Sequence, residues 1–206
     1  MNTISTFEDN NELDRNIDLN DWHVYICKVK KIVQPDMYIS RDVVEMINKI
    51  LLKVQSDVSK IAYEITWSLI DQILNIRIIN YSIKKVLSAE LAEKFGKEST
   101  TICNSIDPKI INSDGHANKI LNDNKLNIDE NIRFLAFSCL NVFHQMELND
   151  SGIDSTCMVY LAGVLDALCK HLINVAASNI QNTECQMITV SDLMNKIDSD
   201  LKKFIN

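Results

Sequence analysis

One long run of apolar residues at helical spacing constrains the fold of this chain more than any other feature. The apolar positions are Val43, Val44, Ile47, Ile50, Leu51, Val54, Val58, Ile61, Ala62, Ile65 and Leu69. Their spacing of three or four residues predicts an amphipathic helix of about eight turns, or ~40 Å at 1.5 Å per residue. Ser40 is its expected N-cap. A helix of this length carries a wide apolar face that needs a partner.

Short helical segments are expected on both sides of this long helix. The segment 22–33 is expected to form a short helix that ends near Pro35, because a proline disfavours the helical conformation of the residue before it. After a break at 70–75, another short helix is expected over 75–87. Ser88 is then expected to cap one more helix, which runs to about residue 102.

The second half of the chain repeats this short-long-short order. A helix is expected over 130–148, a long helix over 156–181, and a short helix with Ser191 as its cap. A polar stretch that contains Pro108 and Gly115 separates the two halves. The expected organisation is an acidic flexible tail at 1–20, a first unit at 21–103, a linker at 104–127 and a second unit at 128–206.

Two units of this kind in one chain predict an internal pseudo-dimer, because the apolar face of each long helix needs an equivalent helix across it. We expect Val58, Ile61 and Ile65 of the first long helix to lie near Leu165, Leu168 and Leu172 of the second. The composition agrees with an all-α fold. Only 4 Gly and 2 Pro are present, whereas an all-β fold would need many turns.

The charge excludes a strongly basic nucleic-acid binder, because 28 acidic residues outnumber 21 basic residues and give a net charge of −7. The acidic, polar N-terminus does not resemble a signal peptide. No continuous apolar run reaches the length of a membrane span, about 18 residues. We therefore expect a soluble intracellular protein that does not bind a membrane.

Catalytic chemistry finds little support in the sequence. The four histidines are scattered, and the six cysteines contain no C-x-x-C pair, so we expect structural thiols, no metal site and no cofactor. Trp22, Tyr25 and Tyr81 are expected to pack in the core or at hinges. We therefore expect no enzymatic activity and no small-molecule substrate.

The order of the helices and several short motifs resemble the histone fold. From about Trp22 to Ile102 the strings VYICKVKKIVQPD, MINKILLKVQSDVSKIAYEI and VLSAELAEK resemble histone 2B. From about Ile132 to Ile205 the strings VYLAGVLDALCKHLINVAAS and MITVSDLMNKI resemble histone 2A. The chain thus looks like a histone 2B–histone 2A doublet, the fused arrangement of certain giant DNA viruses.

This resemblance implies two histone folds that pair within one chain as a pseudo-heterodimer, in the handshake arrangement. It implies a histone 3–4 type doublet, or histones, as partners, and double-stranded DNA as a ligand that is bound weakly by this chain alone. It also implies a location in the host nucleus, or in the viral factory and virion if the protein is viral.

The resemblance also implies two groups of site residues. The expected DNA phosphate contacts are Lys28, Lys30, Lys31, Ser40, Arg41, Arg77 and Arg133. The expected acidic patch for a basic partner consists of Glu90, Glu98 and Asp166, with His171 and Asn174 in place of two further acidic members. The alternatives are a solvated helix face for the cations and ordinary surface charge for the carboxylates.

The sequence departs from the family at its basic elements. The loop at 70–73 reads Ile-Asp-Gln-Ile and the loop at 184–187 reads Glu-Cys-Gln-Met, where basic residues are expected. A basic N-terminal tail is missing, and the chain stops before the segment with which histone 2A docks on histones 3 and 4. Two functions remain open. One is a histone-like protein that packages DNA with a partner, and the other is an acidic histone-fold interaction module, such as a transcription-regulatory or histone-binding subunit with little DNA binding.

Overall fold

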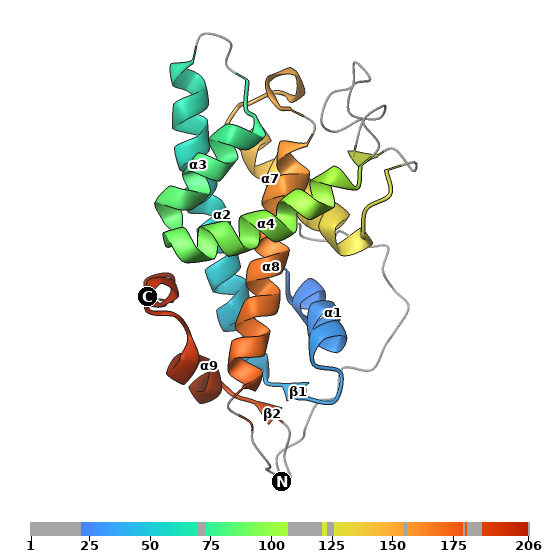
Figure 1. Cartoon of the computed structure of the whole chain (residues 1–206), viewed down its shortest axis with the longest axis vertical. Coiled ribbons are helices and arrows are strands. Elements are labelled where there is room, and N and C mark those ends of the chain that lie inside the picture. Colours follow the sequence, from blue (N-terminus) through green and yellow to red (C-terminus); the bar gives the residue numbers. More distant parts are fainter. Residues whose placement is uncertain are drawn as a thin grey trace.

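A computed structural model describes residues 22–69, 73–106, 121–122, 126–154, 156–178, 180 and 187–205. This part of the chain is all-α, with one pair of two-residue strands (Figure 1). In the first half the elements are α1 (His23–Val33), β1 (Tyr38–Ile39), α2 (Arg41–Ser68), α3 (Ile76–Val86) and α4 (Ala89–Asn104). In the second half they are α7 (Glu130–Gln145), the 3-10 turn η1 (Asp150–Gly152), α8 (Cys157–Ala177), β2 (Met187–Ile188), α9 (Val190–Lys196) and α10 (Ser199–Lys202). The expected tail at 1–20, most of the linker, and the loop residues 70–72 and 184–186 lie outside the described residues.

The helix ends follow local capping chemistry. The position of Ser40 as the N-cap of α2 is confirmed, although its side chain makes no capping hydrogen bond. Ser88 is the N-cap of α4, and its Oγ accepts a hydrogen bond from the Leu91 amide at 3.5 Å. The expected cap at Ser191 is wrong. Helix α9 begins two residues earlier, because Thr189 and Asp192 form a reciprocal capping box.

Helix α8 is the centre of the fold. It packs against α4 and α7 and also contacts α1, α2, α3 and α9 (Figure 1). Its length and its mean hydropathy of 1.4 would suit a membrane span, but 78% of its most apolar window is buried inside the protein. Contacts with the surrounding helices therefore account for its apolar character.

Helix α4 lies unusually close to α8 at one point. A Cβ atom on Gly163 would lie 2.7 Å from Ser99 Oγ and 3.1 Å from Ser99 Cα. The hydroxyl of Ser99 donates a hydrogen bond to the main-chain oxygen of Tyr160 at 2.5 Å. Because Gly163 has no side chain, the two helices can approach each other this closely.

The two halves are also joined by paired loops at both ends of the long helices. Strand β1 pairs in parallel with β2, so that Tyr38 is opposite Met187 and Ile39 is opposite Ile188. A parallel bridge joins Leu74 to Ile153 at the other end. At each end, the loop before one long helix therefore pairs with the loop after the other long helix.

The core is continuous between the two halves. Val58, Leu165, Leu168 and Leu172 are fully buried in it. Ile61 and Ile65 are partly buried and pack against the same core. Burial of each such side chain contributes roughly 1.5 to 3 kcal/mol, so contacts between the halves are a main source of stability.

Candidate functional site

The three lysines expected to form a basic face on α1 differ in their exposure to solvent. Lys28 and Lys31 are exposed, whereas Lys30 is 9% exposed and its Nζ lies 3.5 Å from the Pro35 carbonyl oxygen. Burial lowers the pKa of the Lys30 ammonium, although Cys27 and Asp36 act in the opposite direction. The surface of α1 therefore offers Lys28 and Lys31 to an anion.

Ser40 and Arg41 lie where α2 begins, next to the paired strands. The Ser40 amide donates to the Ile188 carbonyl oxygen at 3.1 Å, which fixes this loop against the second half. The Arg41 side chain is 80% exposed, and its Nε donates to Glu45 Oε1 at 2.8 Å. An exposed ion pair of this kind contributes little energy, so the guanidinium remains available to a phosphate.

The remaining two expected phosphate contacts differ from each other. Arg77 is exposed in the first turn of α3, beside the bridge between Leu74 and Ile153. The Arg133 guanidinium donates to the main-chain oxygens of Leu121 at 2.6 Å and Leu126 at 2.7 Å. Arg133 therefore anchors the chain that leads into α7.

The expected acidic residues do not form one surface cluster. Glu90 and Glu98 are exposed on α4, whereas Asp166 is 5% exposed in α8. Tyr25 Oη donates to Asp166 Oδ1 at 2.7 Å, and Lys170 Nζ lies 2.7 Å from Asp166 Oδ2. Both oxygens of Asp166 are thus engaged, which leaves Glu90 and Glu98 as the exposed pair.

The buried network around Asp166 shifts two neighbouring groups. Burial raises the pKa of the Tyr25 phenol well above its usual value, and Cys169 and Asp166 add to this effect. Burial acts to lower the pKa of Lys170, but the ion pair with Asp166 outweighs it and the pKa is raised. The raised pKa values keep the Tyr25 phenol neutral and the Lys170 ammonium charged at neutral pH, and both groups contact Asp166 at the junction of α1 and α8.

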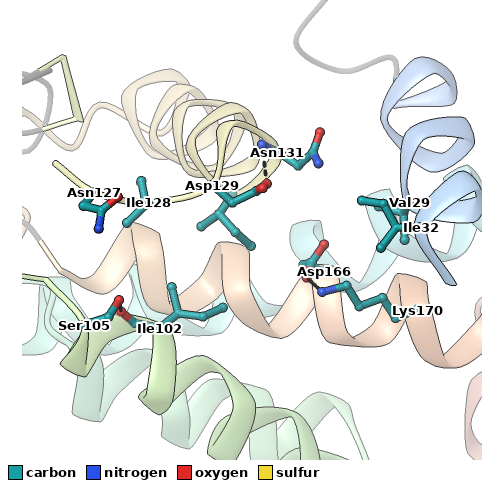
Figure 2. Close-up of a pocket in the computed structure, with 11 residues that line it drawn as sticks. Val29, Ile32, Ile102, Ser105, Asn127, Ile128, Asp129, Asn131, Asp166 and Lys170 are labelled. Atoms are coloured by element: carbon teal, nitrogen blue, oxygen red, sulfur yellow. Dashed lines mark hydrogen bonds and ion pairs between the residues drawn. The ribbon is translucent and has the colours of Figure 1, made fainter.

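A cavity of about 370 Å³ adjoins this network and was not expected from the sequence (Figure 2). Val29, Ile32 and Ile102 form an apolar part of the cavity wall. Asp166 and Lys170 also line the cavity and form an ion pair. The Asp129 carboxylate accepts from the Asn131 amide at 2.8 Å and caps α7. Both carboxylates of the cavity therefore already have partners in the fold.

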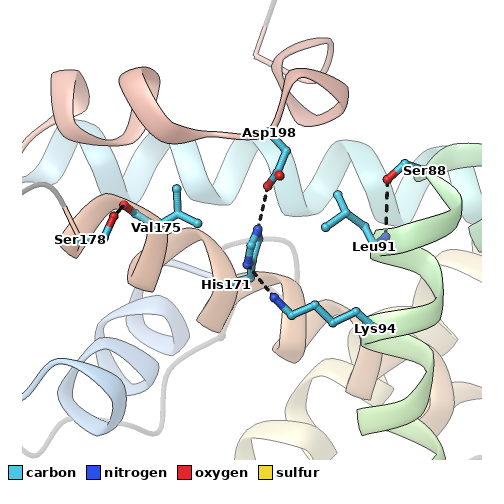
Figure 3. Close-up of polar contacts among 7 residues, drawn as sticks. All are labelled: Ser88, Leu91, Lys94, His171, Val175, Ser178 and Asp198. Atoms are coloured by element: carbon cyan, nitrogen blue, oxygen red, sulfur yellow. Dashed lines mark hydrogen bonds and ion pairs between the residues drawn. The ribbon is translucent and has the colours of Figure 1, made fainter.

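A second unexpected arrangement links α4, α8 and the C-terminal segment (Figure 3). His171 Nε2 lies 2.7 Å from Asp198 Oδ2, and His171 Nδ1 lies 3.1 Å from Lys94 Nζ. The sequence places Asp198 27 residues away from His171 and Lys94 77 residues away, so no local spacing indicates this contact.

Exposed aromatic residues lie on the first half. Trp67 is 48% exposed and packs edge-on against Tyr63 on α2, with the ring centroids 5.9 Å apart. Tyr81 on α3 is 52% exposed, with Lys85 Nζ 5.1 Å from the centre of its ring. The expectation that Tyr81 is a core or hinge residue is therefore wrong, while Trp22 and Tyr25 are buried as expected.

The described cysteines are free thiols with low reactivity. Cys139, Cys157 and Cys169 are fully buried, and Cys27 and Cys103 are partly buried. Burial raises the pKa of Cys103 and of Cys139 to about 12. These thiols therefore remain protonated at neutral pH, as structural cysteines do.

No group of three or more His, Cys, Asp or Glu side chains in the described part of the chain is placed to hold a metal ion. A scan against protein-family models finds no match, and a search of curated proteins finds no similar sequence.

Proposed function

We propose that this chain is a histone-like architectural protein, a fused 2B–2A type doublet that joins a histone 3–4 type partner to package DNA in nucleosome-like particles. In this proposal α1–α4 and α7–α9 are two histone folds in a handshake. The observation that carries it is the reciprocal pairing of the loops, with β1 against β2 and Leu74 against Ile153. Burial of apolar faces alone does not require loops of the two halves to pair at both ends of the long helices. A handshake arrangement does require it.

The exposed cations support a role on DNA with a partner. Lys28, Lys31, Arg41 and Arg77 are exposed. Helix α2 begins at Arg41, and the amide groups of its first turn favour an anion. With about four phosphates neutralised, log K falls with log[salt] at a slope of roughly −0.9 per phosphate, so binding by this chain alone is weak at physiological salt.

The exposed aromatic residues and carboxylates suit a basic protein partner. Trp67 and Tyr81 combine apolar area with a polar edge, which is typical of partner-binding surfaces. Glu90 and Glu98 stand two turns apart on one side of α4 and are exposed. We assign Trp67 and Tyr81 to contacts with the folded part of the partner and the carboxylate pair to a basic tail.

The alternative function is an acidic histone-fold interaction module, such as a transcription-regulatory or histone-binding subunit with little DNA binding. The inward positions of Lys30 and Arg133 favour it, because they remove two of the expected phosphate contacts from a chain of net charge −7. Both functions are intracellular. The first places the protein with DNA, in the host nucleus or in a viral factory and virion.

Partner-assisted DNA binding separates the two functions. The parent and a Lys28→Glu, Lys31→Glu, Arg41→Glu variant would be titrated onto duplex DNA, with and without a histone 3–4 complex. We expect weak binding by the parent alone, stronger binding with the partner, and loss of this gain in the variant. Glu45→Gln is a control that leaves the cations in place. An equal gain for the parent and the triple variant would favour the interaction module.

A further inference from the structure

The side chain of His171 is held between two oppositely charged groups from other parts of the chain (Figure 3). Asp198, in the segment between α9 and α10, lies 2.7 Å from Nε2. Lys94, on α4, lies 3.1 Å from Nδ1. The His171 side chain is 15% exposed, and its ring centroid lies 5.6 Å from that of Phe95.

These two contacts select one protonation state of the imidazole. A lysine ammonium has only donors, so Nδ1 accepts from Lys94, while Nε2–H donates to the Asp198 carboxylate. A doubly protonated ring keeps the contact with Asp198. It presents a second N–H to the Lys94 ammonium, however, and that contact is lost through repulsion between two cations.

The position of Lys94 links this contact to the exposed carboxylates of α4. Lys94 lies four residues after Glu90 and four residues before Glu98, so that all three share one side of the helix. Within the described residues, the ion pair along α4 joins Lys97 to Glu93 at 2.7 Å and involves neither Glu90 nor Glu98. While His171 holds Lys94, both carboxylates thus have no ion pair among the described residues, and Glu98 acts on Lys170 only electrostatically, by helping to raise its pKa.

The other charged groups near His171 already have contacts. Lys170, the preceding residue of α8, pairs with Asp166 at 2.7 Å. Among the described residues, Lys94 and Asp198 are the charged groups within hydrogen-bond distance of the ring, while Asp200 and Lys202 follow on α10 without a contact to it. Protonation of His171 therefore acts first on Lys94.

We propose that His171 is an acid-sensitive positioning residue that controls whether Glu90 and Glu98 are open to a basic peptide. This inference rests on the proposed role of these carboxylates in binding a basic tail. At neutral pH the imidazole accepts from Lys94 and keeps it away from the carboxylates. In acid the imidazolium releases Lys94, which pairs with Glu90 or Glu98 along α4, and the added positive charge disfavours a cationic ligand.

The test is a titration of the full chain with a synthetic peptide of three arginines separated by glycines, at about pH 7.5 and about pH 5.5. These values lie within the range over which imidazoles titrate. Loss of an exposed charge pair predicts an affinity about two- to fivefold lower for the parent in acid. His171→Gln should bind equally at both values, because an amide accepts from Lys94 and donates to Asp198 at either pH. His144→Gln, which changes an exposed histidine on α7, should keep the pH dependence of the parent.

A second readout follows the lysine itself. The NMR signal of the Lys94 side chain should shift over the same pH interval in which the His171 ring titrates, and it should not shift in His171→Gln. Two results would overturn the inference. One is peptide binding with the same pH dependence in the parent and in His171→Gln. The other is a Lys94 signal that does not change as His171 is titrated. A failure of the peptide to bind at either pH would instead overturn the proposed role of Glu90 and Glu98, and this inference with it.

Discussion

Tyr25 and Asp166 join the two halves of the chain through a buried hydrogen bond of 2.7 Å. Tyr25 lies on α1 of the first half, and Asp166 lies on α8, the central helix of the second half. The aspartate is also the partner of Lys170, so that its charge is compensated inside the protein. Tyr25 was expected in the core and Asp166 at a binding surface, and the structure buries both at the junction of the two halves.

Replacement of Tyr25 by Phe should destabilise the fold without opening a large cavity. The substitution removes one buried hydrogen bond to a charged group, and we expect a loss of about 1 to 3 kcal/mol in the free energy of unfolding. Urea denaturation provides the measurement. Tyr38→Phe is the matched control, because Tyr38 is 71% exposed and should tolerate the change. Equal stability of Tyr25→Phe and the parent would show that the hydrogen bond contributes nothing.

The close contact of α4 and α8 predicts losses of different size at two glycines. Gly163→Ala should destabilise the protein by about 1 to 3 kcal/mol, because the new methyl group would contact the Ser99 main chain and force the helices apart. Gly96→Ala should be less destabilising. Its Cβ would meet the far end of the buried Tyr160 side chain, with the phenol oxygen at 2.9 Å, and no main-chain atom, and alanine favours a helix. Thermal unfolding of both variants checks the difference, and similar melting temperatures would contradict it.

The buried thiol of Cys139 predicts a loss of stability in alkaline solution. Burial raises its pKa from 9.0 to about 12 in the folded protein, so the fold favours the protonated thiol. The corresponding stability is fully present below about pH 9 and is lost as the pH rises toward 12. Cys139→Ala should therefore show a shallower fall in unfolding free energy between about pH 9 and pH 10.5. Parallel pH curves for the parent and the variant would exclude this contribution.

Hydrophobic periodicity predicts the longer helices, and two of the three expected capping serines mark helix starts. The spacing between Val43 and Leu69 predicts α2, and Ser40 and Ser88 mark helix starts that the structure confirms. The paired strands were missed, because strands of two residues carry no alternation of apolar and polar side chains. Pairing of this kind is set by tertiary contacts.

The positions of the site residues were harder to predict, because exposure depends on the partners that the fold supplies. Asp166 and Arg133 look like surface charges in the sequence. In the structure Asp166 contacts Tyr25 and Lys170, and Arg133 donates hydrogen bonds to main-chain oxygens. Lys28 and Arg41 remain at the surface as expected. His171 gains its contacts from residues distant in the sequence, which no local pattern reveals.

Nuclease protection of DNA tests the proposed function most directly. The full chain, a histone 3–4 complex and long duplex DNA would be combined at physiological salt and digested, and the length of the surviving DNA measured. The proposal predicts a discrete protected fragment that is longer than the fragment protected by the partner alone. It also predicts that this extra length is lost with Lys28→Glu, Lys31→Glu and Arg41→Glu. A fragment of the same length with and without this chain would contradict a packaging role.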